Sequence, residues 1–148
     1  MRAFVDTNLW VYCFDQREPD KSRWIKQWLR KLAADNEIVV STQVLIELRS
    51  VLTRKLKPPV SAEAAHGVLL SVARFEVVST DSPLVLDAHV LAQREQLGWF
   101  DALIVEAAIR SGCDVLYSED LAHHRKCSGL IIRNPFLDEE FKTHTLDP

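Results

Sequence analysis

The feature that most constrains this chain is a repeated alternation of short apolar runs with longer amphipathic segments. The apolar runs are rich in β-branched residues and have the length of buried strands, and the segments between them carry apolar residues at helical spacing. Strands that alternate with helices form a parallel sheet covered by helices on both faces. We therefore expect an α/β fold, a three-layer α/β/α sandwich around a central, mainly parallel five-stranded sheet. Its strands are expected at residues 2–5, 37–40, 75–78, 115–117 and 130–132.

Side chains suited to capping precede the expected helices. A polar side chain at the N-cap accepts a hydrogen bond from a main-chain N–H group that the helix leaves unpaired. Proline at an early helical position strengthens the signal, because its fixed φ suits the first turn. The expected caps are Asp20, Ser41 or Thr42, Ser61, and Asp81 or Ser82 before Pro83.

The composition indicates one globular domain. The chain has 148 residues, 47% of them hydrophobic and 26% charged, which suits a single core and argues against disorder. No apolar run approaches the roughly 20 residues that span a bilayer. Asp6 comes too early in the sequence for the core of a signal peptide. We expect a cytoplasmic protein without a membrane segment.

Charge and cysteine content exclude some classes of function. The formal net charge of −3 argues against a protein that simply coats nucleic acid, since such proteins are usually basic. It does not exclude an enzyme that acts on nucleic acid, because bound cations would offset acidic side chains at its surface. Cys13, Cys113 and Cys127 form no CxxC pair, so the sequence predicts neither a disulfide framework nor a zinc knuckle.

Acidic side chains follow two of the expected strands. Asp6 ends the first strand, and Glu119 and Asp120 follow the fourth. Parallel strands place their carboxyl ends at one edge of the sheet, which is where open α/β sheets bind ligands. We therefore expect these acids to meet at that edge.

Two more acids lie on expected helices. Asp101 stands at a helix start, on the same side as the apolar residues Ile104 and Val105. Glu47 lies mid-helix at the border of an apolar stripe, where a carboxylate is uncommon without a partner. Both positions favour side chains that face a cleft.

Each of these acids also has a purely structural interpretation. The alternatives are an N-cap or first-turn acid for Asp101, a cap for Asp6, a turn for Asp120, and a hydrogen bond with Gln43 or Ser50 for Glu47. Each alternative is plausible singly. Four acids expected at one edge or cleft indicate a shared role.

A divalent cation would reconcile carboxylates that converge. Such carboxylates repel one another, and a hard cation removes that conflict. Oxygen-only ligands suit Mg²⁺ or Mn²⁺, which combine a few carboxylates with water and a substrate phosphate. A site of this kind can activate water and stabilise the leaving oxygen of a phosphodiester hydrolysis. Zinc is not predicted, because the set contains no His or Cys.

Several segments taken together resemble the PIN-domain ribonucleases. The resemblance covers residues 1 to about 137 in the right order and spacing. It implies a PIN-like nuclease domain at residues 1–137, followed by a polar C-terminal tail at residues 138–148. The segments are Phe4-Val5-Asp6-Thr7-Asn8, Glu47 in the helix after the second strand, Trp99 to Ile104, Cys113 to Leu121, and Ile131 to Phe136.

The resemblance also implies a function and partners. Single-domain members of this size are usually VapC-type toxins, each the toxin of a type II toxin–antitoxin pair. By similarity, we expect a Mg²⁺- or Mn²⁺-dependent endoribonuclease that cleaves RNA, forms a homodimer and binds a cognate antitoxin. Carried over position by position, Asp6, Glu47, Asp101 and Asp120 match the catalytic and metal-binding acids, with Glu119 as an alternative neighbour and Asn8 and Ser118 as supporting polar residues.

Basic and aromatic residues are candidates for binding RNA and a partner. Cations near the acids would contact phosphates. The best placed are His123, His124, Arg125 and Lys126, directly after Asp120, although a solvated loop explains such a run equally well. Other candidates are Arg17, Lys21, Arg23, Arg49, Arg54 and Lys55, and Trp24, Trp28 and Leu32 could form a groove for an antitoxin helix, although core or dimer packing is the commoner role of such residues.

Two alternative functions compete with a nuclease. A receiver-like phosphoacceptor also gathers acids at strand ends, but it needs an Asp at the end of the third strand, where this chain has Ser79 and Thr80. A non-catalytic binding or scaffold protein with the PIN fold would keep the acids for stability. The sequence leaves this second alternative open.

Overall fold

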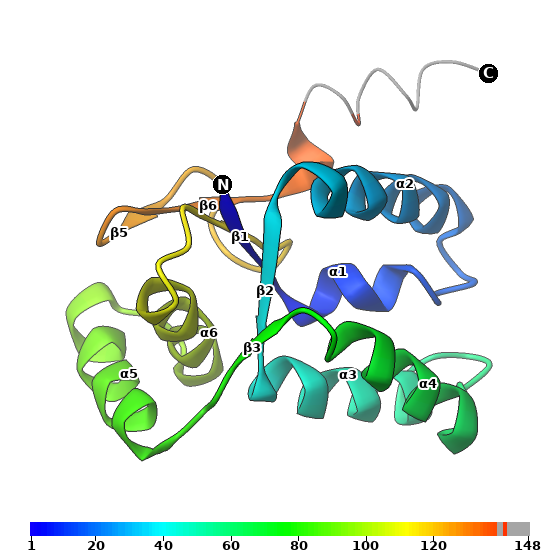
Figure 1. Ribbon diagram of the computed structural model, residues 1–148, viewed down its shortest axis with the longest axis horizontal. Coiled ribbons are helices and arrows are strands. Elements are labelled where there is room, and N and C mark those ends of the chain that lie inside the picture. The colour runs from blue at the N-terminus through cyan, green and yellow to red at the C-terminus, as the bar shows by residue number, and fades with distance from the viewer. Residues whose placement is uncertain (139–140, 142–148) are drawn as a thin grey trace.

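The computed structural model describes residues 1–138 and residue 141. Within them, six strands form one sheet through the middle of the molecule (Figure 1). Their order is β3-β2-β1-β4-β6-β5. All neighbouring pairs are parallel except β5 and β6. The strands are β1 (Arg2–Val5), β2 (Glu37–Ser41), β3 (Glu76–Val78), β4 (Val115–Tyr117), β5 (Lys126–Cys127) and β6 (Leu130–Arg133).

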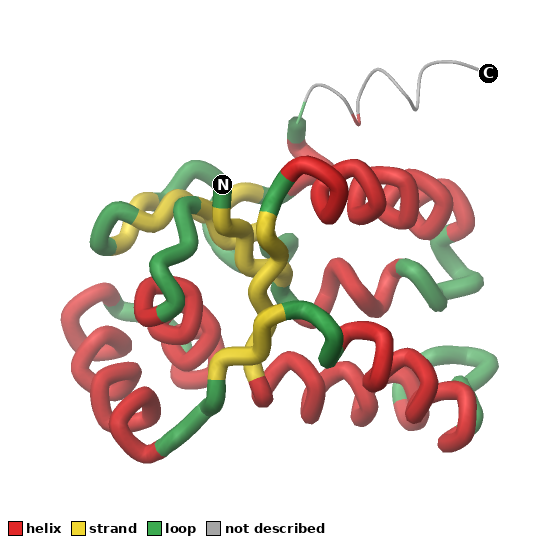
Figure 2. The backbone as a smooth tube through the Cα atoms, viewed as in Figure 1, coloured by secondary structure: helices red, strands yellow, loops and turns green. Residues whose placement is uncertain are grey.

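Helices cover both faces of this sheet, so the expected three-layer arrangement is confirmed (Figures 1 and 2). In the view of Figure 1, α1 to α4 lie to the right of the sheet, and α5 and α6 lie to its left. The helices are α1 (Thr7–Tyr12), α2 (Pro19–Asp35), α3 (Thr42–Arg54), α4 (Ala62–Val72), α5 (Ser82–Glu95) and α6 (Trp99–Arg110), and a 3₁₀ turn (Pro135–Leu137) follows β6.

The sheet has one strand more than the five predicted. β5 and β6 form a hairpin whose two turn residues, Ser128 and Gly129, have φ angles of 49° and 84°. Positive φ at both positions belongs to the tight turns that connect antiparallel strands. The five-strand prediction was wrong here because a two-residue strand is too short to show an alternation of apolar and polar residues.

Most of the predicted helix starts are confirmed. The side chains of Ser41, Ser61 and Asp81 accept hydrogen bonds from main-chain N–H groups in the first turn of α3, α4 and α5. The prediction for Asp20 was wrong, because α2 begins at Pro19 and Asp20 lies within its first turn. Proline at the first helical position has the φ that a helix requires, so it sets the start before the acid.

Of the three residues considered for an antitoxin groove, Trp24 and Leu32 belong to the core, and the half-buried Trp28 packs against it. Trp24 is buried, with its ring centroid 6.1 Å from Trp28 and 5.5 Å from Phe136. Leu32 is also buried. Most of the expected tail, residues 138–148, lies outside the described residues, but Phe141 within it packs at 5.0 Å against Trp24.

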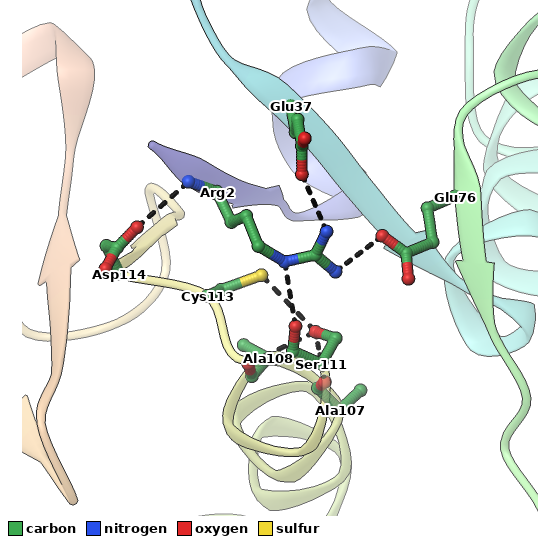
Figure 3. A network of polar contacts seen from close by, with 8 residues as sticks. All are labelled: Arg2, Glu37, Glu76, Ala107, Ala108, Ser111, Cys113 and Asp114. Carbon is green, nitrogen blue, oxygen red and sulfur yellow. Dashed lines mark hydrogen bonds and ion pairs between the residues drawn. The ribbon is translucent and has the colours of Figure 1, made fainter.

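The amino-terminal ends of the strands meet at a charged network centred on Arg2 (Figure 3). The Arg2 guanidinium pairs with Glu37 at 2.8 Å and with Glu76 at 2.5 Å, and its Nε donates to the carbonyl oxygen of Ser111. The main-chain N–H of Arg2 donates to Asp114. We call Arg2, Glu37, Glu76 and Asp114 the amino-edge cluster.

Among the helices that the structure describes, none has the length and hydropathy to cross a membrane.

Candidate active site

The opposite edge of the sheet has the topology of a ligand site. Chain connections run outward from β1 in both directions, to β2 and β3 on one side and to β4 and β6 on the other. Ligands of open α/β sheets bind at such a reversal of strand order, outside the carboxyl ends of the strands. Here Asp6 follows β1, and Ser118, Glu119 and Asp120 follow β4. The main-chain N–H of Asp6 bonds to the carbonyl of Tyr117 at 3.0 Å, which fixes the two strand ends side by side.

Asp6 is a buried carboxylate with several hydrogen-bond donors. Its side-chain oxygens accept bonds from the Ser118 hydroxyl at 2.8 Å and from the main-chain N–H of Thr7 at 2.7 Å. The residue also stands at the N-cap of α1, so its structural interpretation as a cap is confirmed. Burial raises the pKa of Asp6 to about 6, with smaller contributions from the charges of Glu47 and Asp120, while the bonds from Ser118 and Thr7 act in the opposite direction.

Glu47 is held by hydrogen bonds to both of its oxygens. The Thr7 hydroxyl donates to Oε2 at 3.0 Å, and the Gln43 amide donates to Oε1 at 2.7 Å. The bond with Gln43 confirms one of the two hydrogen-bond partners that the sequence placed one helical turn from Glu47. Because Thr7 contacts Asp6 through its main chain and Glu47 through its side chain, it links β1 to α3.

Asp101 lies in the first turn of α6 but does not cap it. The N-cap is Gly98, which has no side chain to accept a bond. Within the described residues, no hydrogen bond or ion pair reaches the Asp101 carboxylate. Burial raises its pKa, and the charges of Asp120 and Glu47 add to that increase. Of the two structural alternatives for Asp101, the N-cap is therefore wrong and the first-turn acid is confirmed.

Asn8 connects the ends of β1 and β4. Its amide nitrogen donates to Asp120 at 3.0 Å, to Ser118 at 3.3 Å and, at 3.5 Å, to Asp6. Its amide oxygen accepts from the main-chain N–H of Glu119 at 3.2 Å. The predicted supporting residues, Asn8 and Ser118, thus lie among the acids that they were expected to support.

Glu119 differs from its neighbour because it is already paired. Its carboxylate lies 3.0 Å from the Lys21 ammonium, and the Tyr12 phenol bonds to it as well. Burial and this contact raise the pKa of Tyr12 to about 12. The Lys21 ammonium also lies 4.8 Å from the centre of the Phe136 ring. Asp120, by contrast, is exposed and has no cationic partner among the described residues.

The structure brings the four predicted acids into one electrostatic neighbourhood. In addition to burial, the charges of Glu47 and Asp120 raise the pKa of Asp6, and the same two charges raise the pKa of Asp101. None of the ion pairs among the described residues includes any of the four. We call Asp6, Glu47, Asp101 and Asp120 the carboxyl-edge cluster.

The donors of the carboxyl-edge cluster match a hard divalent cation in chemistry. They are all carboxylate oxygens, their negative charge is unbalanced, and two of the four have raised pKa values. Their spacing is open, however: in the part of the chain that the structure describes, no three His, Cys, Asp or Glu side chains form a group ready to hold a metal ion. Asp6 and Glu47 are fixed by several bonds, so closure on a cation would fall to Asp101 and Asp120.

A groove of about 570 Å³ opens beside the cluster. Glu47, Asp120 and Glu119 line it together with Thr7 and Asn8. The remaining lining is mixed in character, with apolar, basic and acidic side chains contributed by α1, the loop after it and α3. These further residues are Val11, Tyr12, Asp15, Arg17, Glu18 and Val51.

The basic run after Asp120 is divided between internal contacts and solvent. The Arg125 guanidinium bonds to the main-chain carbonyl of Glu95, and His123 Nδ1 accepts from the main-chain N–H of Asn134 at 2.9 Å. His124 and Lys126 are exposed. Lys126 pairs with Ile131, which lies beside Val115 at the start of β4, so it is displaced from Asp120 toward the opposite edge of the sheet.

Two contacts of the site were missed by sequence reasoning. They are the bond of the Thr7 hydroxyl to Glu47, which depends on the packing of α1 against α3, and the bond of Gln43 to the carbonyl of Phe100 in α6. The position of Gln43 four residues before Glu47 is a usable signal for one bond. Its second bond, to the carbonyl of Phe100, joins residues 57 positions apart and leaves no local pattern.

Comparison with known proteins adds a family and a set of similar folds. A family model for the PIN domain matches residues 3–128. VapBC2 from Rickettsia felis, bound to a DNA fragment from its promoter, is similar with a TM-score of 0.64 and 22% identity, covering 90% of this chain and 98% of that chain. No curated protein matches.

Two further solved structures have the same fold. The toxin VapC20 from Mycobacterium tuberculosis, which cleaves the sarcin–ricin loop, gives a TM-score of 0.57 at 20% identity and covers 80% of this chain and 89% of its own. A toxin–antitoxin complex from Klebsiella pneumoniae gives 0.63 at 18% identity and covers 87% and 95%. At such identities the likeness is one of fold.

Proposed function

Because the chain belongs to the PIN-domain family, we propose that it is a divalent-metal-dependent endoribonuclease that hydrolyses RNA phosphodiester bonds. The observation that carries the proposal is the carboxyl-edge cluster, where four acids meet without a basic partner among the described residues. An uncompensated group of carboxylates beside a groove calls for a cation supplied from solution.

Asp6, Glu47, Asp101 and Asp120 would hold Mg²⁺ or Mn²⁺. When bound, such an ion activates water and neutralises charge on the phosphate. Asp6 and Glu47 supply oxygens whose directions are fixed by Ser118, Thr7 and Gln43. Glu119 is left out of the set because Lys21 already neutralises it.

The groove would take the RNA strand past these acids. From the basic run we assign His124 to phosphate contact, since Arg125 and His123 make internal bonds and Lys126 lies toward the amino-terminal end of β4. Arg17 lines the groove itself, where it is paired with Asp15 at 3.0 Å. Loss of one such contact would weaken binding similarly for all RNA sequences.

We further propose that the protein is the toxin of a type II toxin–antitoxin pair, acts in the cytoplasm as a homodimer, and binds a cognate antitoxin. The support is its likeness in fold to toxin–antitoxin proteins from Rickettsia felis and Klebsiella pneumoniae. Co-expression with the product of the adjacent reading frame, followed by size measurement of the purified complex, tests the pairing. A chain that purifies alone and at monomer size would contradict both assignments.

A non-catalytic scaffold with the PIN fold is the second candidate. The observation in its favour is the open spacing of the acids. Within the described residues, no three of them lie close enough to form a group ready to hold a metal ion. Such a protein would keep the fold and lack the reaction.

One assay separates the two candidates. Wild-type protein and Asp6→Ala are incubated with RNA in Mg²⁺ and, separately, in EDTA. If the protein is a nuclease, RNA is cleaved only in the sample that contains wild-type protein and Mg²⁺. If it is a scaffold, RNA stays intact in every sample. Cleavage that persists in Asp6→Ala would identify a contaminating nuclease and defeat the proposal.

A further inference from the structure

We infer that Gln43 is a positioning residue of the carboxyl-edge cluster, whose side-chain amide fixes Glu47 and ties it to the start of α6, the helix that carries Asp101. The inference rests on the proposed function, since it concerns how the candidate metal-binding carboxylates are held. Gln43 would not itself touch the cation or the RNA.

The Gln43 amide bridges two elements that each carry an acid of the cluster. Its nitrogen donates to Glu47 Oε1 at 2.7 Å and to the carbonyl oxygen of Phe100 at 3.1 Å. A primary amide has two N–H donors, so both are in use. Phe100 directly precedes Asp101, and therefore one side chain links the carboxylate of α3 to the first turn of α6.

The setting of Gln43 leaves its side chain little freedom. The residue is 7% exposed, and its main-chain N–H bonds to the Thr80 hydroxyl at 3.3 Å. Turning the amide over would place its oxygen against the oxygens of Glu47 and Phe100 and lose both bonds. The observed orientation is thus the only one of the two that satisfies its neighbours.

This arrangement has a cost that stability alone does not explain. The amide oxygen of Gln43 is buried without a hydrogen-bond partner among the described residues. A buried acceptor without a partner destabilises a protein, and an apolar side chain of similar size would avoid that penalty. A position that departs from the best packing choice is expected where function requires a particular group.

Gln43 completes a continuous chain of hydrogen bonds through the cluster. Asn8 joins Asp120 to Asp6, Thr7 joins Asp6 to Glu47, and Gln43 joins Glu47 to the peptide before Asp101. Groups that orient metal ligands in this way commonly change metal affinity or activity by about 10- to 100-fold when removed. We expect an effect of that size at Gln43.

Calorimetric titration with Mn²⁺ alone, without RNA, tests the inference. Gln43→Met keeps the length of the side chain and removes the amide, and its dissociation constant for Mn²⁺ should rise by about 10- to 100-fold. Gln93→Met, on the exposed face of α5, is the matched control and should bind as wild type does. Gln43→Asn keeps an amide one methylene short, so it should also lose affinity and replaces Gln43→Met if that variant does not fold.

A double-mutant cycle with Glu47→Gln separates positioning from a general structural role. If Gln43 acts through Glu47, adding Gln43→Met to Glu47→Gln causes no further loss of affinity. Equal losses in both backgrounds, or a Gln43→Met protein that binds Mn²⁺ like wild type, would overturn the inference and leave the proposed function intact. A wild-type protein that binds no Mn²⁺ would overturn both.

Discussion

Two groups of acids occupy opposite edges of one parallel sheet, and they differ in how their charge is balanced. In the amino-edge cluster, Arg2 lies between Glu37 and Glu76 and pairs with both, while its main chain bonds to Asp114 (Figure 3). The arginine joins the starts of three strands and the turn before a fourth. Two of the three carboxylates at this edge are thus paired with a cation that the chain itself supplies, and the third accepts a main-chain N–H.

The carboxyl-edge cluster gathers its acids with no internal cation among the described residues. Lys21 is engaged with Glu119, and Arg17, which lines the groove, is engaged with Asp15. Burial raises the pKa values of Asp6 and Asp101, and the charges of Glu47 and Asp120 add to both increases. The two edges therefore differ in one respect: acids of the amino-edge cluster pair with an arginine, whereas those of the carboxyl-edge cluster have no cationic partner among the described residues.

The largest expected difference between the edges is in catalysis. If Asp101 is a metal ligand as proposed, Asp101→Asn should lower the rate of Mg²⁺-dependent RNA cleavage by at least about 100-fold, because it removes the charge that holds the cation. Glu76→Gln, at the other edge, should change the rate less than about twofold, since a surface substitution away from the site changes little. Single-turnover cleavage rates of both variants measure this difference. A Glu76→Gln rate as low as that of Asp101→Asn would contradict the distinction between the two edges.

A second difference is in stability without metal. The folded-state pKa of Asp6, about 6, is above its ordinary value of 3.8, so the charged carboxylate destabilises the fold above pH 6. Asp6→Asn should therefore increase the free energy of unfolding in EDTA by up to about 3 kcal/mol at pH 8. As the pH falls through 6, the wild-type carboxylate takes up a proton in the folded state and the advantage should shrink, reaching zero below about pH 4.

Urea denaturation at several pH values measures this effect. Asp20→Asn, an exposed acid of α2, is the control and should show no such pH dependence. A wild-type protein that loses stability between pH 7 and pH 5, relative to Asp6→Asn, would contradict the expected direction of the effect.

A third effect has the opposite sign, because it removes the cation of the amino-edge cluster. Arg2→Met should lower the free energy of unfolding by about 1–2 kcal/mol, a range reduced for the partial exposure of the ion pairs. High salt should diminish the loss, since it screens the pairs that wild type still makes. The exposed pair of Arg23 and Asp20 is the comparison, and Arg23→Met should change stability by less than about 0.5 kcal/mol.

The parts of the molecule that follow from local pattern could be predicted, and those that follow from packing could not. The end of β1 at Asp6 and the end of β4 before Asp120 were readable, because a parallel sheet brings strand ends together whatever its other contacts. The pairing of Lys21 with Glu119 joins residues 98 positions apart, and no local signal precedes it. The two-residue β5 was missed for a related reason, since its strand character comes only from its neighbour β6.

The charge state of the site was hidden by the same limitation. Sequence gives the number of acids near an edge but not the partner of each, so Glu119 and Asp120 could not be ranked. Only the packing of α2 against the end of β4 reveals that Lys21 neutralises Glu119. The sequence therefore provides a set of candidate acids, and the ion pairs of the structure show which of them already has a cationic partner.

The smallest predicted effect tests this division directly. Lys21→Met removes one positive charge and frees Glu119, so the site becomes more negative. Its affinity for Mn²⁺ should rise by about two- to fourfold at low ionic strength, the size expected for a unit charge acting through a solvated groove. The free energy of unfolding should fall by no more than about 1 kcal/mol, since the pair is only partly buried. Lys21→Arg keeps the charge and should leave the affinity near that of wild type. If Lys21→Met instead bound Mn²⁺ more weakly, Lys21 would be ordering the site through Tyr12 and Glu119, and Glu119 would have to be returned to the set of candidate ligands.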